Sequence, residues 1–243
     1  MDALVSVFFF LIAALYASVG HAGASGYLAV MALAGFAPEV MRTTALALNL
    51  LVSGVVVWRM VRAGVMPWRQ AIPFLPLSVP LAWLGGHMLL PQEVFRFVIA
   101  LFLLYAAGYL LWRMRGGAFD RDFVRLPRGL PVALGGVLGF AAGTTGIGGG
   151  ILLSPILMMG GLAGARHTAA ISALFIFANS AAGLLARAAA GAQLAPAVGW
   201  YGLAVLAGGV IGGELAARGL KPRAITICLA AVLVVAALKF LLT

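Results

Sequence analysis

The sequence predicts an all-α integral membrane protein built from two homologous halves, and three observations lead to this prediction. Of the 243 residues, 64% are hydrophobic and 9% are charged, a composition outside the range of water-soluble domains. Apolar runs long enough to cross about 30 Å of hydrocarbon as helix recur along the whole chain. A set of short motifs in the first half returns in the same order in the second half.

Apolar runs, separated by Gly, Pro and charged residues, define about eight main helical segments. They are 4–20, 39–59, 70–90, 93–112, 129–146, 165–187, 196–217 and 221–242. Two shorter apolar pieces, 26–35 and 150–161, each reach about half-way across a membrane at about 1.5 Å per residue. Each follows a glycine-rich break, so we expect two glycine-broken or re-entrant half-helices.

The two breaks belong to a duplicated pattern whose offsets scatter between 124 and 130 residues, as in an old duplication with small insertions. The matched motifs are GHAG at 20 and GIGG at 146, RTTA at 42 and RHTA at 166, Asn49 and Asn179, Gly64 and Gly191, and LGGH at 84 and IGGE at 211. The simplest organisation is a first membrane repeat over 1–112, a charged cytoplasmic linker over 113–128 and a second membrane repeat over 129–243.

Loop charges bear on whether the halves are parallel or inverted. Four plain crossings in each half would place 10 Lys and Arg on one side and 6 on the other. If the first long segment and its short partner instead form a re-entrant pair, the count becomes 12 against 4. Because basic loops stay in the cytoplasm, the second count favours inverted repeats, with parallel halves as the alternative.

Several functional classes are poorly supported. The formal charge of +10 lies in short loops beside apolar segments, as the positive-inside rule expects, and no nucleic-acid module is present. The single cysteine, Cys228, offers neither a disulfide framework nor a metal-ligand spacing, and it is most simply a packing residue. Without HExxH, Gly-x-Ser-x-Gly or P-loop motifs, we expect no enzyme, no cofactor and no metal site.

The glycine breaks are the candidate binding site. Backbone that is not helical at membrane depth must be satisfied by protein or by a water-filled cavity. The start of a half-helix presents unpaired N–H groups and about half a positive charge, so it favours an anion. The candidate substrate-binding residues are Gly20, His21, Gly23, Ser25, Gly26, Asn49, Thr144, Thr145, Gly146, Gly148, Gly149, Gly150 and Asn179.

Each candidate also has a structural interpretation. Small-xxx-small spacing makes close helix packing the favoured role of one set of glycines, namely Gly139, Gly208, Gly209, Gly212 and Gly213. The glycines at 148–150 favour binding, since three in a row beside Thr144, Thr145 and Ser154 exceed what a packing face needs.

The polar candidates are open to the same choice. For Asn49 and Asn179 the alternatives are hydrogen bonds to substrate oxygens and hydrogen bonds between helices. For Arg42 and Arg166 they are attraction of an anion and contact with lipid phosphate at the membrane surface. His21, within the first break, is able to bind an anion or to titrate, whereas His87 and Glu214 suit membrane boundaries.

The motif Gly-x-Gly-Gly-Gly-x-x-x-x-Pro at 146–155, followed by a helix that opens with His167-Thr168-Ala169, resembles the sulfite exporter TauE/SafE family. The resemblance covers nearly the whole chain in segment number, duplication and motif placement. The first-half copy departs from the pattern, because it lacks the triple glycine and has Ala29 where the second copy has Pro155. Members of that family are regarded as secondary transporters of small sulfur-containing anions in the bacterial cytoplasmic membrane.

The resemblance implies a multi-pass protein of the bacterial inner membrane that carries sulfite, a sulfonate or a similar organosulfur anion. We expect export driven by the proton-motive force, with the anion and membrane lipids as partners and no nucleic acid. The alternatives are a non-transporting membrane scaffold or subunit and a carrier of another small solute. A metal cargo fits poorly with the few carboxylates and thiolates at membrane depth.

Overall fold

The computed structural model describes residues 2–18, 20–88, 91–114, 127, 129–159, 162–217 and 223–242. Within these residues every regular element is a helix. Most of the expected linker, 113–128, lies outside the described residues, as does the side chain of Cys228.

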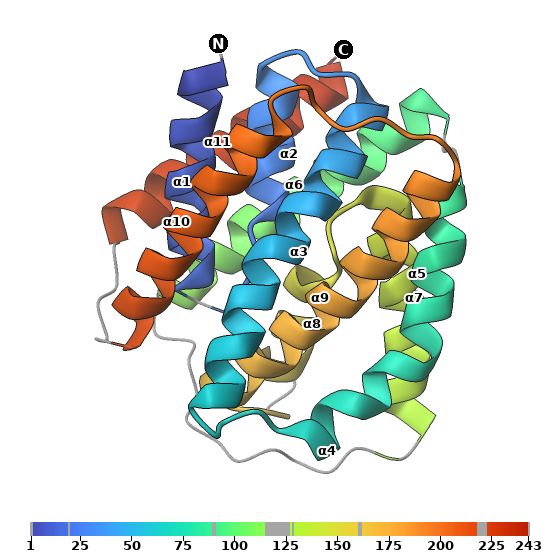
Figure 1. Ribbon diagram of the computed structural model, residues 1–243, viewed down its shortest axis with the longest axis vertical. Coiled ribbons are helices and arrows are strands. Elements are labelled where there is room, and N and C mark those ends of the chain that lie inside the picture. Colours follow the sequence, from blue (N-terminus) through green and yellow to red (C-terminus); the bar gives the residue numbers. More distant parts are fainter. Residues whose placement is uncertain are drawn as a thin grey trace.

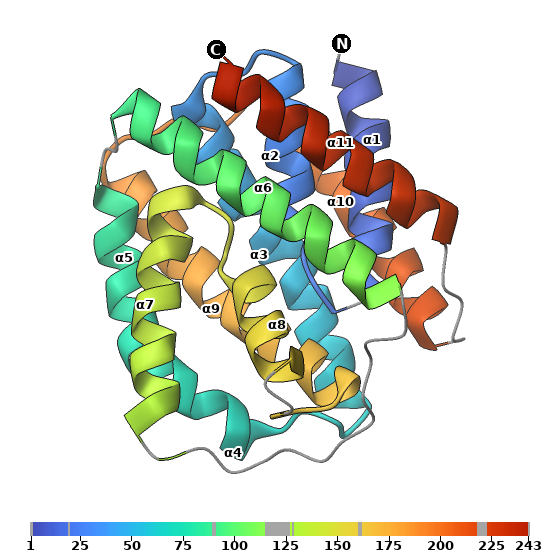
Figure 2. The same ribbon diagram turned by 180° about the vertical axis from the view of Figure 1, so that it is seen from behind.

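Each sequence range expected to form a main segment or a half-helix contains a helix (Figures 1 and 2). In the first half these are α1 (Asp2–Ala17), α2 (Ala24–Leu33), α3 (Pro38–Arg62), α4 (Trp68–Ala71), the 3₁₀ turn η1 (Ile72–Phe74), α5 (Leu75–His87) and α6 (Gln92–Met114). In the second half they are α7 (Gly129–Thr145), α8 (Gly150–Met159), α9 (Ala165–Ala189), α10 (Val198–Ala217) and α11 (Arg223–Leu242). The range 70–90 is divided because Pro73 and Pro76 cannot donate the hydrogen bonds of a continuous helix.

Two helices stand out by length and composition. Among the described residues, α3 and residues 166–189 of α9 are long and apolar enough to cross a membrane. Both have 25 residues and end in the same way, with a glycine in the left-handed conformation just beyond the last turn, Gly64 at φ 66° and Gly191 at φ 72°. This glycine lets the following backbone cap the last carbonyls of the helix.

The shorter helices form two hairpins at opposite ends of the molecule. The upper end is defined here as the end at which α2 ends and α3 begins, and the lower end as the end at which α3 ends and α9 begins (Figure 1). From the upper end, α1 runs to the middle and α2 returns, whereas α7 rises from the lower end and α8 turns back toward it (Figures 1 and 2). The two glycine breaks therefore lie inside the bundle.

Contacts between the halves come in matched pairs. The ends of α3 and α9 correspond at an offset of 127 residues. At that offset Gly86 lies against Ala186, and its counterpart Gly213 lies against Arg59, the counterpart of Ala186. Similarly, Gly20 contacts Ala169 on α9, and Gly146 contacts Arg42 on α3. Exchanging the halves thus reproduces these contacts.

At this offset two of the sequence matches differ by about one helical turn. Position 42 corresponds to Ala169, and Arg166 lies three residues before it. Asn49 corresponds to Ile176, and Asn179 lies three residues after it. The similar motifs RTTA and RHTA therefore occupy different turns of α3 and α9.

Glycines create the closest helix contacts, as their spacing predicted. Gly139 and Gly143 on α7 lie against the backbone of α5 at Ser78 and Ala82. On α10, Gly208 and Gly212 lie against the backbone of α1 at Phe10 and Ala14. Because a Cβ at any of these positions would meet backbone atoms, the packing interpretation of Gly139, Gly208 and Gly212 is confirmed.

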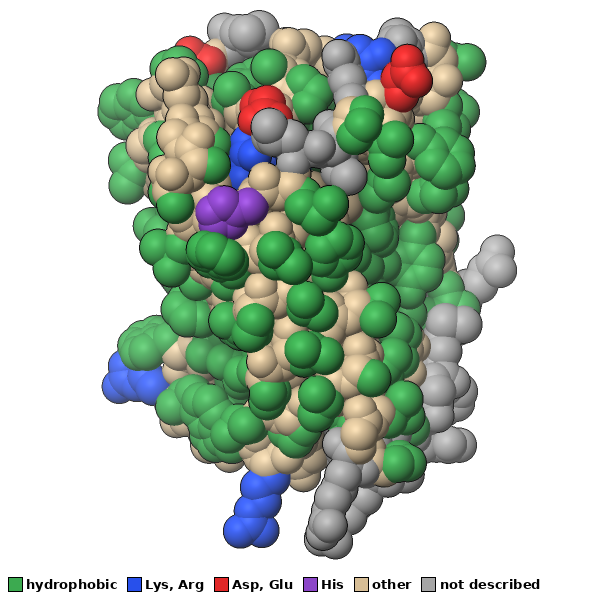
Figure 3. All heavy atoms as spheres, turned by 90° about the vertical axis from the view of Figure 1, so that its right-hand side faces the viewer, with side chains coloured by type: hydrophobic (Ala, Val, Ile, Leu, Met, Phe, Trp, Pro, Cys, Tyr) green, Lys and Arg blue, Asp and Glu red, His purple; other side chains and the backbone are tan. Residues whose placement is uncertain are grey.

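The surface has the distribution of a membrane-embedded bundle. On the face shown in Figure 3, charged side chains gather at the two ends, and the band between them is hydrophobic. Large apolar side chains in this molecule are exposed on many helices, among them Val137, Leu185 and Trp200, at 65% or more of their surface. Such exposure would be unfavourable in water but suits contact with lipid.

Candidate functional site

The two breaks contain turns in the left-handed backbone conformation, which favours glycine. Gly20 and Gly23 have φ values of 82° and 102° in the first break. In the second break the values for Gly146, Gly148 and Gly149 lie between 75° and 79°. Because a side chain strains this conformation, the sequence permits these turns only where it has glycine. They aim the starts of α2 and α8 into the interior.

Helix α3 holds the second break in place through Asn49. The fully buried Asn49 amide donates a hydrogen bond of 3.1 Å from Nδ2 to the carbonyl oxygen of Ile147. The next residue, Gly148, lies between two central helices. A Cβ there would come within 2.8 Å of Asn49 Nδ2 on α3 and 3.0 Å of Ser180 Oγ on α9. Gly148 is thus the point where the break meets polar groups from both halves.

Buried polar atoms without a hydrogen-bond partner gather on the helices that flank Gly148. Among the described residues, Asn49 Oδ1, Asn179 Oδ1 and Ser180 Oγ are buried and have no such partner. The Asn179 amide donates from Nδ2 to the carbonyl oxygen of Phe175 at 2.8 Å. Since carbonyl oxygens only accept, these bonds fix both amides with Oδ1 as the unsatisfied atom. An unsatisfied buried group costs about 1–3 kcal/mol, so these atoms mark a place for water or a ligand.

The first break joins the second half through His21. This buried side chain lies 2.7 Å from Ser154 Oγ on α8, measured from its Nε2 atom, and Ser154 Oγ lies 2.7 Å from Ser172 Oγ on α9. Ser25, in the first turn of α2, shares a hydrogen bond of 2.6 Å with the hydroxyl of Tyr16. A hydrogen-bonded chain therefore runs from the first break across α8 to α9.

Several predicted site residues bond to or pack against protein atoms. The hydroxyl of Thr144 donates to Phe140 and that of Thr145 donates to Ala141, both within the last turns of α7. Other glycines of the breaks make room for protein side chains: Gly26 for Ile12, Gly23 for Tyr27, Gly149 for Phe175 and Gly150 for Ile176. Of the three consecutive glycines, Gly148 is the one that lies against polar side chains, those of Asn49 and Ser180, together with Ile176.

Arg42 and Arg166 do not come together. Arg42 lies in the second turn of α3 and Arg166 in the first turn of α9, and these two helices begin at opposite ends of the molecule (Figure 1). Arg42 is 2% exposed and donates from Nη2 to the carbonyl oxygen of Met88 at 3.1 Å, whereas Arg166 is exposed. Arg166 therefore has the exposed position that contact with interfacial phosphate requires, whereas the side chain of Arg42 is held within the protein.

Sequence reasoning missed the arginine that lies beside Arg42 in space. Arg187, in the last turn of α9, is 1% exposed and forms an ion pair with Glu39 in the first turn of α3. Its Nε also donates to Thr43 Oγ1 at 3.4 Å. An arginine at the end of an apolar segment resembles an interfacial residue, and a carboxylate 148 positions away gives no local signal. The pair fastens α3 to α9 at the upper end.

No group of three His, Cys, Asp or Glu side chains within the described ranges is placed to hold a metal ion. His87 is half-buried and bonds the Trp83 carbonyl one turn earlier, and Glu214 is exposed. The interior polar groups are therefore amides, hydroxyls, arginines and one histidine, which suit hydrogen bonding to an oxygen-rich solute.

Comparisons with known proteins place the chain in a family. The sequence model described as "Sulfite exporter TauE/SafE" matches residues 5–240. A protein of Sinorhizobium fredii named "Probable membrane transporter protein y4hK" is 37% identical over 243 residues, which cover 98% of this chain and 97% of that protein. No solved structure matches significantly. The chain therefore belongs to the sulfite exporter TauE/SafE family and is a multi-pass membrane transporter of that type.

Proposed function

We propose that this protein is a secondary transporter that exports a small sulfur-containing oxyanion, such as sulfite or a sulfonate, across the bacterial cytoplasmic membrane. The observation that carries the proposal is the set of unsatisfied buried polar atoms on α3 and α9, the two helices that flank Gly148 just before α8 begins. The family match supports the class of cargo, and the burial of these atoms inside the bundle supports a transport site over a surface site.

The polar groups favour a particular protonation state of the cargo. At the start of α8 the backbone N–H groups and the hydroxyl of Ser180 are donors for an oxyanion. Asn49 Oδ1 is an acceptor that needs a donor. A singly protonated oxyanion such as hydrogensulfite has both kinds of group, whereas a fully deprotonated dianion has none to offer Asn49. For sulfite, we infer that the cargo brings its own proton into the site, whereas a sulfonate stays deprotonated near neutral pH and has no proton to offer Asn49.

We further propose that residues 1–112 and 129–243 are inverted repeats joined by the linker 113–128. The opposite directions of the α1–α2 and α7–α8 hairpins support this arrangement (Figures 1 and 2). The matched contacts at an offset of 127 residues support a two-fold relation between the halves. Such repeats place the substrate site where their broken helices meet and alternate access between the two sides.

The second break also lies close to a buried cation. The backbone of Arg42 contacts Gly146 at the start of the break, and Asn49 and Ser180 flank Gly148. The charge of Arg42 would provide long-range attraction for an anion that approaches from the upper end.

Flux into vesicles tests the function. Purified protein is reconstituted into liposomes, and uptake of ³⁵S-labelled sulfite is measured under an imposed pH gradient, with labelled sulfate as the control. We expect sulfite, which takes up a proton near neutral pH, to accumulate at least ten times faster than sulfate. Absence of flux with every sulfur oxyanion tried would reject the proposed cargo.

The same vesicles test the alternative of a non-transporting scaffold. A scaffold predicts that folded, correctly assembled protein gives no flux with any anion. It also predicts that substitutions at Gly148 change assembly alone. Retained folding with lost flux in a Gly148 variant would exclude the scaffold.

A further inference from the structure

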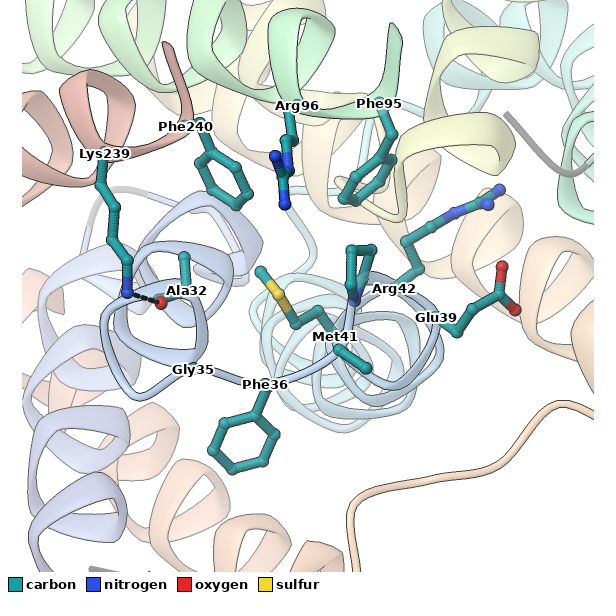
Figure 4. Close-up of a pocket in the computed structure, with 12 residues that line it drawn as sticks. Ala32, Gly35, Phe36, Glu39, Met41, Arg42, Phe95, Arg96, Lys239 and Phe240 are labelled. Atoms are coloured by element: carbon teal, nitrogen blue, oxygen red, sulfur yellow. Dashed lines mark hydrogen bonds between the residues drawn. The ribbon is translucent and has the colours of Figure 1, made fainter. Parts of the chain in front are cut away.

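A cavity of about 720 Å³ opens at the upper end of the molecule, apart from the buried polar cluster. Its walls come from the end of α2 and the loop after it, the first turns of α3 and α6, and the last turn of α11 (Figure 4). This volume lies within the range of about 300–1,000 Å³ that is typical of pockets for organic ligands. A bare sulfur oxyanion would leave most of it empty.

Cations line this cavity from different helices. Lys239 comes from α11 and Arg96 from α6, and Arg42 lies at the opposite edge from Lys239 (Figure 4). Lys239 donates to the carbonyl oxygen of Ala32 at 2.6 Å, and Arg42 donates to that of Met88. The carboxylate of Glu39, which also lines the cavity, forms its ion pair with Arg187.

Arg42 has donor capacity that the protein does not use. Its side chain is 2% exposed, and its Nε has no hydrogen-bond partner among the described residues. The guanidinium carbon lies 5.6 Å from the centre of the Phe95 ring, a distance at which the ring face attracts the cation. A buried guanidinium with an unused N–H is most stable when an acceptor completes it.

The rest of the wall is apolar. Phe36, Met41, Phe95 and Phe240 line the cavity, and Met41 and Phe95 are each 1% exposed. Arg96 and Phe240 extend side by side from above in Figure 4, so a charge and an aromatic ring face the same space. A ligand that uses both must carry an acidic group on an apolar body.

We propose that this rim cavity, lined by Phe36, Met41, Arg42, Phe95, Arg96, Lys239 and Phe240, binds an amphiphilic organic monoanion. The acidic group, a carboxylate, sulfonate or phosphate ester, lies among the cations, and the apolar body lies against the aromatic rings. The ligand is either a dissolved organic acid or an anionic lipid of the surrounding bilayer. The site is one-sided, because Ala169 occupies the place of Arg42 in the other half.

Binding of benzenesulfonate tests the proposal without reference to flux. Purified protein in phosphatidylcholine nanodiscs is titrated calorimetrically with benzenesulfonate, with sulfate, and with benzyl alcohol, which separate the acidic group from the apolar body. We expect benzenesulfonate to bind at least tenfold more tightly than either of the others. Equal affinity for sulfate, or no binding of benzenesulfonate, would overturn the proposal.

Variants locate the site. Lys239→Met and Arg96→Met each keep a long side chain and remove one charge, and each should weaken benzenesulfonate binding at least fivefold. Arg69→Met removes an exposed charge from α4 at the lower end and should leave the affinity unchanged. Equal affinities in all three variants would place the bound sulfonate elsewhere and reject the rim cavity.

A second lipid composition identifies the source of the ligand. The titration is repeated in nanodiscs that contain phosphatidylglycerol. If benzenesulfonate binds more weakly in these nanodiscs, and Lys239→Met removes the difference between the two lipid compositions, the cavity is assigned to an anionic lipid. An unchanged affinity would assign it to a dissolved organic acid. If the protein gives no sulfite flux but still binds benzenesulfonate, the proposed transport function is rejected and the proposed rim site is retained.

Discussion

The amide of Asn49 donates a hydrogen bond of 3.1 Å to the carbonyl oxygen of Ile147, so a helix of the first half holds the glycine break of the second half. The two residues are 98 positions apart in the sequence. The Oδ1 atom of the same amide is buried and has no hydrogen-bond partner, and its Nδ2 atom lies 2.8 Å from the Cβ position of Gly148. One side chain therefore both holds the break and carries an unused acceptor.

Replacing Asn49 should remove both the hydrogen bond that holds the break and the unused acceptor, while the rest of α3 keeps its contacts. In Asn49→Ala the carbonyl of Ile147 loses its partner, which costs about 1–3 kcal/mol of stability, and we expect sulfite flux to fall at least tenfold. Ser53→Ala is the matched control, because the Ser53 hydroxyl is buried one turn away and donates to the Asn49 carbonyl of its own helix. Flux is measured per folded protein, and equal flux in the two variants would argue against the site.

A methyl group at Gly148 should block the site sterically. Gly148→Ala would place a Cβ 2.8 Å from Asn49 Nδ2 and would strain a backbone held at φ 78°. Gly64→Ala is the matched control, since that glycine has φ 66° but nothing within 4 Å of its Cβ position. Both variants carry a left-handed strain of about 1–2 kcal/mol. We expect Gly148→Ala to lose sulfite flux and also to lose the rise in melting temperature that ligand binding causes, whereas Gly64→Ala should keep both. The same result in both variants would contradict the steric block.

His21 provides a test of where the proton travels. In His21→Gln an amide can keep the hydrogen bond to Ser154, but it cannot titrate. Since we infer that the cargo carries its own proton, this variant should still accumulate sulfite under a pH gradient, within about threefold of the normal rate. A variant that equilibrates sulfite but no longer responds to the gradient would assign the proton to His21 instead.

The inverted arrangement predicts that equivalent positions face opposite sides of the membrane. Ala63 and Ala190 are exposed alanines just beyond α3 and α9, both with right-handed backbone, so a cysteine fits either one. In a background with Cys228→Ser, a membrane-impermeant thiol reagent should label Ala63→Cys and Ala190→Cys from opposite sides. Labelling of both from the same side would refute inverted repeats and restore the parallel alternative.

Much of the helical pattern could be predicted because each helix is marked locally. Apolar runs give the helices, Pro38 marks the start of α3, and Gly64 and Gly191 mark two ends. The breaks at Gly20 and Gly146 were also visible, since glycine is the residue that such turns require.

Partners across the bundle could not be predicted from the sequence. The bonds of His21 to Ser154 and of Arg187 to Glu39 join residues more than 130 positions apart, and neither pair has a spacing signature. For the same reason, the sequence could not show that the glycines at 148–150 have different neighbours. Gly149 and Gly150 accommodate Phe175 and Ile176, and only the folded bundle shows that Gly148 faces amide and hydroxyl groups.

The central claim is that a sulfur oxyanion rests beside Gly148 between α3 and α9. Selenite is a close chemical analogue of sulfite, and selenium can be located by its anomalous scattering. Crystals of the protein grown with selenite should give an anomalous peak within about 5 Å of Asn49 Oδ1 and Ser180 Oγ, the reach of a selenium–oxygen bond plus a hydrogen bond, and the peak should vanish in Gly148→Ala. Anomalous density confined to the rim cavity or to the protein surface would contradict the proposed site.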